Sequence, residues 1–123
     1  MDRRWRRRLD GKLAERRAQQ FLERAGLVVV ARNYRTRWGE LDLVMHEGDT
    51  VVFVEVRARA PNSVLSAAES VDWAKQHRLQ TTAEHYLARY HGVDTPACRF
   101  DVIAMTGSPN RPHITWIRDA FDT

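Results

Sequence analysis

Two apolar-rich stretches near the middle of the chain flank a short polar stretch that contains glycine. They cover residues 39–46 and 51–57, and the sequence Glu-Gly-Asp-Thr lies between them. Apolar runs on either side of a glycine-containing polar segment are typical of a β-hairpin. With a four-residue loop over 47–50, His46 lies opposite Val51, and this choice fixes the register of both strands.

The register predicts two unlike faces for the hairpin. Residues directly opposite one another in an antiparallel pair share a face. One face is apolar throughout and consists of Leu41, Leu43, Met45, Val52, Val54 and Val56. On the other face Asp42 lies opposite Glu55. Two positions further out, Glu40 lies opposite Arg57.

The facing carboxylates of Asp42 and Glu55 predict a metal site. Their Cβ atoms would lie roughly 4.5–5.5 Å apart, a separation at which like charges destabilise a sheet. A divalent cation relieves this repulsion, since Mg²⁺ binds to one or two carboxylates and keeps several waters. The alternative is a surface hairpin with solvated carboxylates. The apolar back face and Arg57 beside Glu55 favour a site for Mg²⁺ or Mn²⁺.

Helical spacing of apolar residues predicts a helix over residues 10–25. Asp10 is a plausible N-cap, and Gly26 is placed to end the helix. Glu15 lies at the edge of the apolar stripe. From position alone it reads as an exposed side chain, although it could also point into a cleft between the helix and the sheet.

A second helix follows the segment 58–70, which is rich in serine and contains proline. Ser66 and Glu69 form a capping box for this helix, and Gly92 ends it. Lys75 lies on the helix flank that could face the sheet.

The other strands are expected over 27–31 and 99–105, with an edge strand or terminal segment over 114–117. The order is therefore helix, three strands, helix, strand. This order predicts an α/β fold with an α-β-β-β-α-β core, in which a mixed sheet is flanked by helices. A helix joins the third strand to the fourth, so their connection should be a right-handed parallel crossover.

Composition limits the classes of protein that the chain can be. Its 123 residues suit one domain, over 10–123, preceded by a basic arm over 1–9. No apolar run approaches the length of a membrane span, and the arginine-rich start is not a secretory signal. One cysteine, Cys98, agrees with a reducing compartment. We expect a soluble, cytoplasmic protein with no membrane partner.

The net charge of +4 and the pI near 9.8 favour an anionic partner such as nucleic acid. The segment 32–38 combines three arginines with Tyr34 and Trp38, which suits phosphate contact and base stacking. Arg35 and Arg37 are its candidate phosphate ligands, and Arg59 and Lys75 are candidates elsewhere. A solvated connector at 32–38 is the alternative.

The pattern as a whole resembles a known superfamily. Its parts are Ala14-Glu15, the stretch Gly39 to Leu43, the sequence Val52-Phe53-Val54-Glu55-Val56, Lys75, and Arg99-Phe100-Asp101-Val102. Together they resemble the PD-(D/E)xK nuclease superfamily and most closely the YraN-like family, which is related to archaeal Holliday-junction resolvases. The resemblance implies a restriction-endonuclease-like core and a metal-dependent endonuclease that acts on branched or structured DNA. A homodimer is compatible with it.

The resemblance also implies roles for single residues. Asp42 and Glu55 would bind the metal, Glu15 would assist, and Arg57 would stand where the superfamily has a lysine that orients and activates the attacking water. Arginine stays protonated and presents a planar fork of donors, so this replacement is not conservative. A catalytically impaired nucleic-acid-binding module on a nuclease scaffold is therefore the alternative function, and a role as partner of another protein is a third.

Overall fold

The structure is a computed structural model that describes residues 3–58, 71–108 and 111–122. Its elements are, in chain order, α1 (Arg3–Arg24), β1 (Val28–Arg35), β2 (Glu40–Glu47), β3 (Thr50–Ala58), α3 (Trp73–His91), β4 (Cys98–Ser108) and β5 (Arg111–Phe121). This order confirms the predicted α/β core. The terminal strand is longer than the expected 114–117.

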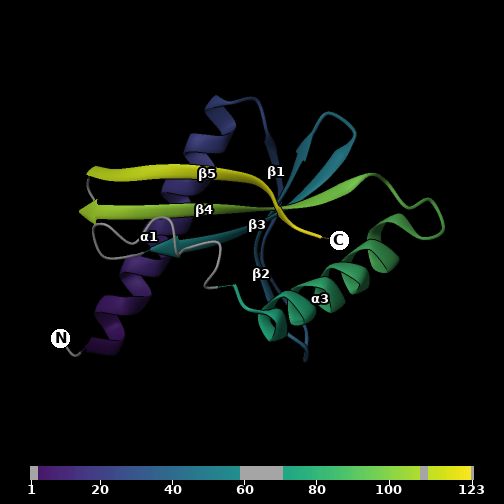
Figure 1. Cartoon of the computed structure of the whole chain (residues 1–123), viewed down its shortest axis with the longest axis horizontal. Coiled ribbons are helices and arrows are strands. Elements are labelled where there is room, and N and C mark those ends of the chain that lie inside the picture. Colours follow the sequence, from purple (N-terminus) through teal and green to yellow (C-terminus); the bar gives the residue numbers. More distant parts are fainter. Residues whose placement is uncertain (1–2, 59–70, 109–110, 123) are drawn as a thin grey trace.

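In the described part of the chain, five strands form one mixed sheet in the order β1-β2-β3-β4-β5. Neighbouring strands are antiparallel except for β3 and β4, which run parallel from Val51↔Cys98 to Ala58↔Met105. The predicted parallel crossover between these two strands is therefore confirmed. Figure 1 shows α1 and α3 on either side of the twisted sheet.

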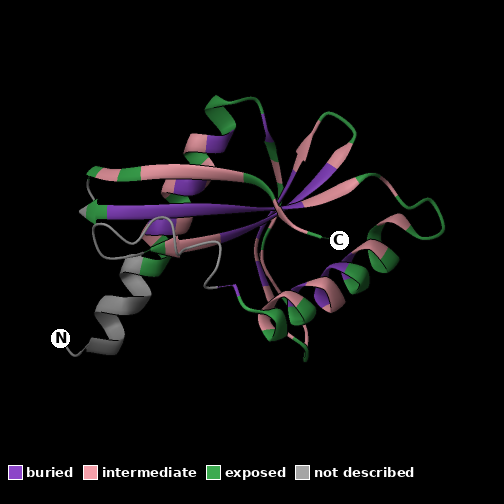
Figure 2. Cartoon of the chain, in the orientation of Figure 1, coloured by how far each residue is buried: buried purple, intermediate pink, exposed green. Residues whose placement is uncertain are grey.

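Each face of the sheet has its own hydrophobic core. Against α1 pack Leu43, Met45, Val52, Val54, Ile103 and Met105, which meet Ala14, Ala18 and Leu22 of the helix. Against α3 pack Leu41, Val44, Val51, Phe53, Phe100 and Val102, which meet Leu79, Ala83 and Tyr86. Figure 2 shows buried residues along the central strands and on the inner faces of both helices.

The β2–β3 hairpin has the predicted register from His46↔Val51 through Val44↔Phe53 to Leu43↔Val54. The predicted pairs of Asp42 with Glu55 and of Glu40 with Arg57 are not formed, because β2 and β3 part beyond Leu43↔Val54 and Glu40 pairs with Arg35 of β1. The hairpin loop is shorter than the expected 47–50, because Glu47 and Thr50 are themselves paired. Gly48 supplies the left-handed conformation that so short a turn needs, with φ +59.

Leu41 does not share a face with Leu43, contrary to the prediction. Leu43 packs in the α1 core and Leu41 in the α3 core. The alternation breaks beside Asn33, whose φ of +51 is rare for a residue with a side chain. Asn33 lies between the paired positions Arg32↔Leu43 and Tyr34↔Leu41. Beyond this point, the side chains of β2 therefore lie on the opposite faces of the sheet from those that the alternation of Leu43 and Met45 predicts.

Both helices differ from the prediction at their starts. Helix α1 begins at Arg3, so Asp10 lies within it and is not its N-cap. Helix α3 is capped by Asp72, whose carboxylate accepts a hydrogen bond from Lys75 N at 2.8 Å. Ser66 and Glu69 lie outside the described residues. Within the described ranges, neither helix combines the length and apolar character needed to cross a membrane.

Candidate metal centre

Strands β2 and β3 separate beyond Leu43↔Val54. From there β2 stays paired with β1 as far as Arg35↔Glu40, while β3 stays paired with β4 as far as Ala58↔Met105. The side chain of Asp42 reaches across this gap, and its Oδ2 accepts a hydrogen bond from Val56 N at 2.9 Å. The point where the two strands part therefore positions Asp42.

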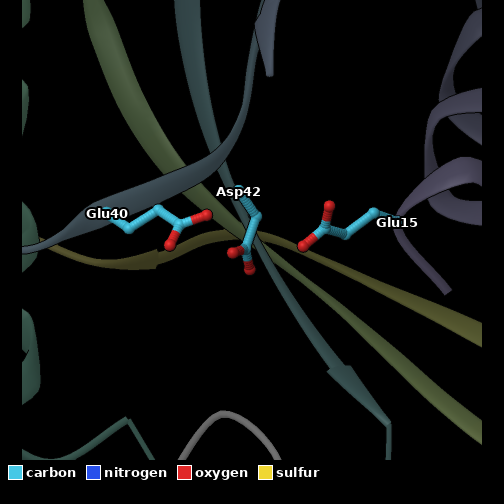
Figure 3. Close-up of side chains that lie close together, drawn as sticks. All are labelled: Glu15, Glu40 and Asp42. Carbon is cyan, nitrogen blue, oxygen red and sulfur yellow. The ribbon is translucent and has the colours of Figure 1, made fainter. Parts of the chain in front are cut away.

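Three carboxylates meet beside the gap. Glu15 comes from α1, and Glu40 and Asp42 come from β2; one carboxylate oxygen of each lies within 4.8 Å of the other two. Figure 3 shows the three carboxylates turned toward a common point, with Asp42 between the others. Glu40 and Asp42 are two residues apart on the strand, so both can point to the same side.

Asn33 ties the cluster together at its rim. In the amide orientation that satisfies both neighbours, Asn33 Nδ2 donates to Glu40 Oε1 at 2.7 Å and to Glu15 Oε2 at 3.1 Å. The left-handed backbone of this residue thus coincides with a polar bridge between helix and sheet. Strained positions of this kind persist where the surrounding structure holds them, and they gather at functional sites.

Glu55 lies on the other side of Asp42. It is buried at 7% exposure, and its carboxyl group interacts with that of Asp42. Burial, followed by the negative charge of Asp42, raises the pKa of Glu55 to about 7. Lys75 and Arg57 oppose this rise: Lys75 Nζ lies 3.8 Å from Glu55 Oε1 and Arg57 Nε lies 3.4 Å from it.

The pKa values of Glu15, Asp42 and Glu55 are all raised. Burial raises the pKa of Glu15, and the charges of Asp42 and Glu40 add to the rise. Burial also raises the pKa of Asp42, against the hydrogen bond from Val56. Negative charge is therefore in excess here, because the nearby cations do not offset burial and mutual repulsion.

Two other acidic side chains, Asp101 and Glu47, are in contrast well supplied with hydrogen-bond donors. Asp101 is completely buried and accepts hydrogen bonds from Arg99 Nε, Trp116 Nε1 and Asp119 N at 2.9–3.0 Å. Glu47 accepts from Arg118 and Arg99 at 2.6 and 2.8 Å, and these bonds lower its pKa. Asp101 and Glu47 therefore belong to a structural network and not to a site short of positive charge.

The three-carboxylate cluster opens to a cleft of about 510 Å³. The residues around it are Gly11, Lys12, Glu15, Asn33, Arg35, Glu40 and Asp42. A neighbouring cavity of about 330 Å³ shares Lys12, Glu15 and Asn33 and adds Arg16, Gln19, Arg32 and Leu43. Basic side chains therefore border the carboxylates on a surface that a large anion can approach.

The donor set fits a hard divalent cation. Mg²⁺ and Mn²⁺ prefer oxygen ligands, and Mg²⁺ sites in proteins commonly combine carboxylates with water. Glu15, Glu40 and Asp42 offer only oxygen and carry the excess charge that a cation would neutralise. Among the described residues, Glu15, Glu40 and Asp42 are the three potential metal ligands that come together. Glu55 lies next to this cluster, beside Asp42.

The structure thus brings together most of the predicted site. Asp42 contacts Glu55 and clusters with Glu15, and Arg57 and Lys75 flank Glu55. Lys75 faces the sheet, as its helix position suggested. The predicted metal pair of Asp42 and Glu55 stays a prediction.

Of the remaining predicted nucleic-acid contacts, Arg35 lines the cleft and Arg37 lies in the turn after β1. Arg35 is exposed and its Nε lies 3.1 Å from Glu40 Oε2, while Arg37 covers the ring of Trp38. Arg59 lies outside the described residues. Glu40 was absent from the predicted site, although its spacing of two residues from Asp42 already placed both on one face.

Comparison with known proteins identifies the family. The model of the uncharacterised protein family UPF0102 matches residues 14–105. A UPF0102 protein of Nitrosomonas europaea is 50% identical over 112 residues, which are 91% of this chain and 92% of the relative. One from Nitrosospira multiformis is 46% identical over 94% of each chain, and one from Burkholderia pseudomallei is 53% identical over 90% of this chain and 74% of its own. The chain belongs to the UPF0102 family.

Proposed function

We propose that this protein is a metal-dependent endonuclease that hydrolyses phosphodiester bonds in DNA. One observation carries the proposal: Asp42 joins an all-oxygen cluster, made with Glu15 and Glu40, to the buried Glu55. Two cationic side chains stand on the other side of Glu55. Carboxylates that suit a divalent cation, next to groups that suit a phosphate, are the parts that phosphodiester hydrolysis requires.

When bound, a divalent cation supplies Lewis-acid stabilisation of the phosphate and lowers the pKa of a bound water. Glu15, Glu40 and Asp42 would hold it. Glu55 has a pKa of about 7, near the ideal for a group that accepts a proton at neutral pH. It is therefore suited to take the proton of the attacking water.

Arg57 is suited to hold the phosphate. Its Nε is buried and, among the described residues, has no hydrogen-bond acceptor, although it lies 3.4 Å from Glu55 Oε1. A guanidinium with donors to spare can bind phosphate oxygens in a fork and stabilise developing negative charge. The ammonium of Lys75, at 3.8 Å from Glu55, adds a second cation.

DNA as substrate is supported by charge and by resemblance. The net charge of +4 and the basic rim of the cleft suit a polyanion. The similarity of the Asp42, Glu55 and Arg57 pattern to PD-(D/E)xK nucleases, and to the resolvases related to the YraN-like family, indicates branched or structured DNA.

A second candidate function is binding of nucleic acid without cleavage. The observation in its favour is Arg57 itself, because an arginine cannot supply or accept a proton as a lysine of lowered pKa can. This function leaves the excess carboxylate charge at Asp42 without a purpose, and we therefore place it second.

Cleavage of end-labelled DNA separates the two functions. Branched, flapped and linear substrates of one sequence would be incubated with Mg²⁺ or Mn²⁺ and either the wild type or Asp42→Asn. Metal-dependent cleavage by the wild type and its loss in Asp42→Asn support the nuclease. Binding with no cleavage of any substrate supports the second function, and equal cleavage by both proteins contradicts the proposed site.

A further inference from the structure

A group of rings and arginines lies where the turn between β1 and β2 packs against α3. Trp38 belongs to the turn, and Tyr90 and His85 belong to α3; Tyr34, at the end of β1, lies between them. Arg37 covers the ring of Trp38 and Arg89 covers that of Tyr90. We call these six residues the aromatic–arginine surface. In Figure 1 this turn is the connection from β1 to β2 beside α3.

The turn is closed by its own hydrogen bonds and packs closely against the helix. Thr36 N donates to Gly39 O at 2.8 Å, and Thr36 Oγ1 accepts from Trp38 N at 3.1 Å. A Cβ on Gly39 would lie 3.2 Å from Thr82 Oγ1 of α3, which is closer than most side chains tolerate. Glycine at this position thus allows the turn to approach the helix. The Trp38 ring consequently packs near α3, with its centroid 5.7 Å from that of His85.

The inner ring of the group, Tyr34, is held by the fold, whereas the outer rings, Trp38 and Tyr90, pack on one side and are partly exposed. Tyr34 donates or accepts one hydrogen bond with His85 at 2.6 Å and packs edge-on against the buried Tyr86. Trp38, in contrast, is 39% exposed and Tyr90 is 55% exposed. Their arginines lie 4.7 and 5.2 Å from the ring centroids.

This chemistry matches an unpaired nucleotide. The exposed part of each ring and the guanidinium group over it are surfaces on which a base can stack. The same guanidinium groups can contact the phosphates that connect successive bases. Arg78, which also borders the turn, is an additional exposed cation. We propose that the aromatic–arginine surface binds a single-stranded segment of DNA by stacking its bases on Trp38 and Tyr90.

The surface and the cleft are joined by the connection from β1 to β2. Trp38 is two residues from Glu40 of the carboxylate cluster, and Arg35, one residue before the turn, lines the cleft and forms an ion pair with Glu40 at 3.1 Å. A strand stacked on Trp38 would therefore lie at the end of the hairpin that carries Glu40 and Asp42. The inference rests on the proposed function: it narrows the substrate to DNA with an unpaired segment next to the scissile phosphate, because bases within a duplex are already stacked on one another.

The test is equilibrium binding without catalysis. Fluorescence anisotropy in EDTA would compare a 12-nucleotide oligo-dT with a blunt duplex of 12 base pairs, for the wild type, Trp38→Ala, Trp38→Phe and Tyr90→Ala. Loss of one stacked base weakens binding by about 5- to 150-fold. We expect that loss on oligo-dT for Trp38→Ala and Tyr90→Ala, partial or full retention for Trp38→Phe, and less than about a twofold change on the duplex.

Trp73→Ala is the matched control. Trp73 is 78% exposed at the start of α3, stacks on His77 and lies outside the aromatic–arginine surface. Equal affinity of wild type and Trp38→Ala for oligo-dT would overturn the inference, as would an equal loss on oligo-dT and duplex. Trp38→Phe keeps the test valid if Trp38→Ala does not fold. The assay measures binding and not cleavage, so it tests base stacking separately from the proposed nuclease activity. Failure of one therefore does not imply failure of the other.

Discussion

The carboxylate of Asp42 accepts a hydrogen bond from the backbone N–H of Val56 at 2.9 Å, across the gap where β2 and β3 part. Asp42 therefore has two roles, as an acceptor that joins the strands and as a member of the carboxylate cluster. Asparagine keeps the acceptor and removes the charge, whereas alanine removes both.

These two substitutions should act on stability in opposite directions. In metal-free protein, Asp42→Asn should raise the melting temperature, because it relieves repulsion by Glu15, Glu40 and Glu55. Asp42→Ala leaves the N–H of Val56 unpaired and should cost about 1–3 kcal/mol. Thermal unfolding in EDTA measures the first effect, and urea unfolding in EDTA measures the second. Equal destabilisation by the two variants would show that repulsion at Asp42 is negligible.

Glu55 should make the metal-free protein less stable as the pH rises. Its pKa in the folded state is raised from 4.5 to about 7, so the folded protein binds more protons than the unfolded chain between these values. Stability from this group is fully present below pH 4.5 and is lost as the pH rises to about 7. The loss is on the order of 3 kcal/mol, since one pKa unit corresponds to 1.36 kcal/mol.

Glu55→Gln isolates this effect because glutamine does not titrate. Unfolding free energies at pH 5 and pH 8, measured in EDTA, should fall more steeply for the wild type than for the variant. Parallel pH profiles of the two proteins would mean that Glu55 is already ionised at pH 5.

Arg57→Lys tests the departure from the nuclease pattern. If Arg57 acts only as a fixed positive charge beside the phosphate, lysine should keep binding and raise the single-turnover cleavage rate, because its pKa can adjust in a partly buried site. We expect this outcome, since a second cation, Lys75, already lies 3.8 Å from Glu55. Arg57→Ala is the control that removes the charge.

Other results for Arg57 have distinct meanings. Weaker binding and slower cleavage by Arg57→Lys would indicate that the guanidinium grips the phosphate as a fork. Equal metal-dependent rates for wild type, Arg57→Lys and Arg57→Ala would contradict any role in catalysis.

Asp101 should matter for stability and not for metal binding. It is completely buried with Arg99, Trp116 and the N–H of Asp119 as donors. Breaking a buried ion pair by removal of one partner costs roughly 3–5 kcal/mol, so Asp101→Ala should unfold at much lower denaturant concentration. Glu47→Gln, at the more exposed end of the same network, is the control and should cost less. Weaker Mn²⁺ binding by a folded Asp101 variant would contradict this separation.

Local sequence was enough to predict the hairpin and its pairing as far as Leu43↔Val54, but not the separation of the strands beyond that pair. The alternation at Leu43, Met45, Val52 and Val54 buries one set of side chains in the α1 core, and a slip by one residue would reverse it. Turn residues and helical spacing likewise predicted the order of elements. These signals lie within a few residues of one another along the chain.

The features that were missed depend on contacts distant in sequence. Leu41 turns to the α3 core because of the left-handed Asn33 on the neighbouring strand, which no alternation rule contains. Glu40 joins the site because α1 brings Glu15 against β2. The pattern placed Glu40 and Asp42 on one face, but only packing of the helix shows what they meet there.

The central claim is that Glu15, Glu40 and Asp42 form one site for a divalent cation, and calorimetric titration with Mn²⁺ tests it most directly. The control is Glu84→Gln, which removes an exposed carboxylate of α3 that borders a different pocket. We predict that wild type and Glu84→Gln bind Mn²⁺ equally, whereas Glu40→Gln and Asp42→Asn lose affinity by at least about tenfold. The same Mn²⁺ affinity in the wild type and Asp42→Asn, with both proteins folded, would contradict the claim.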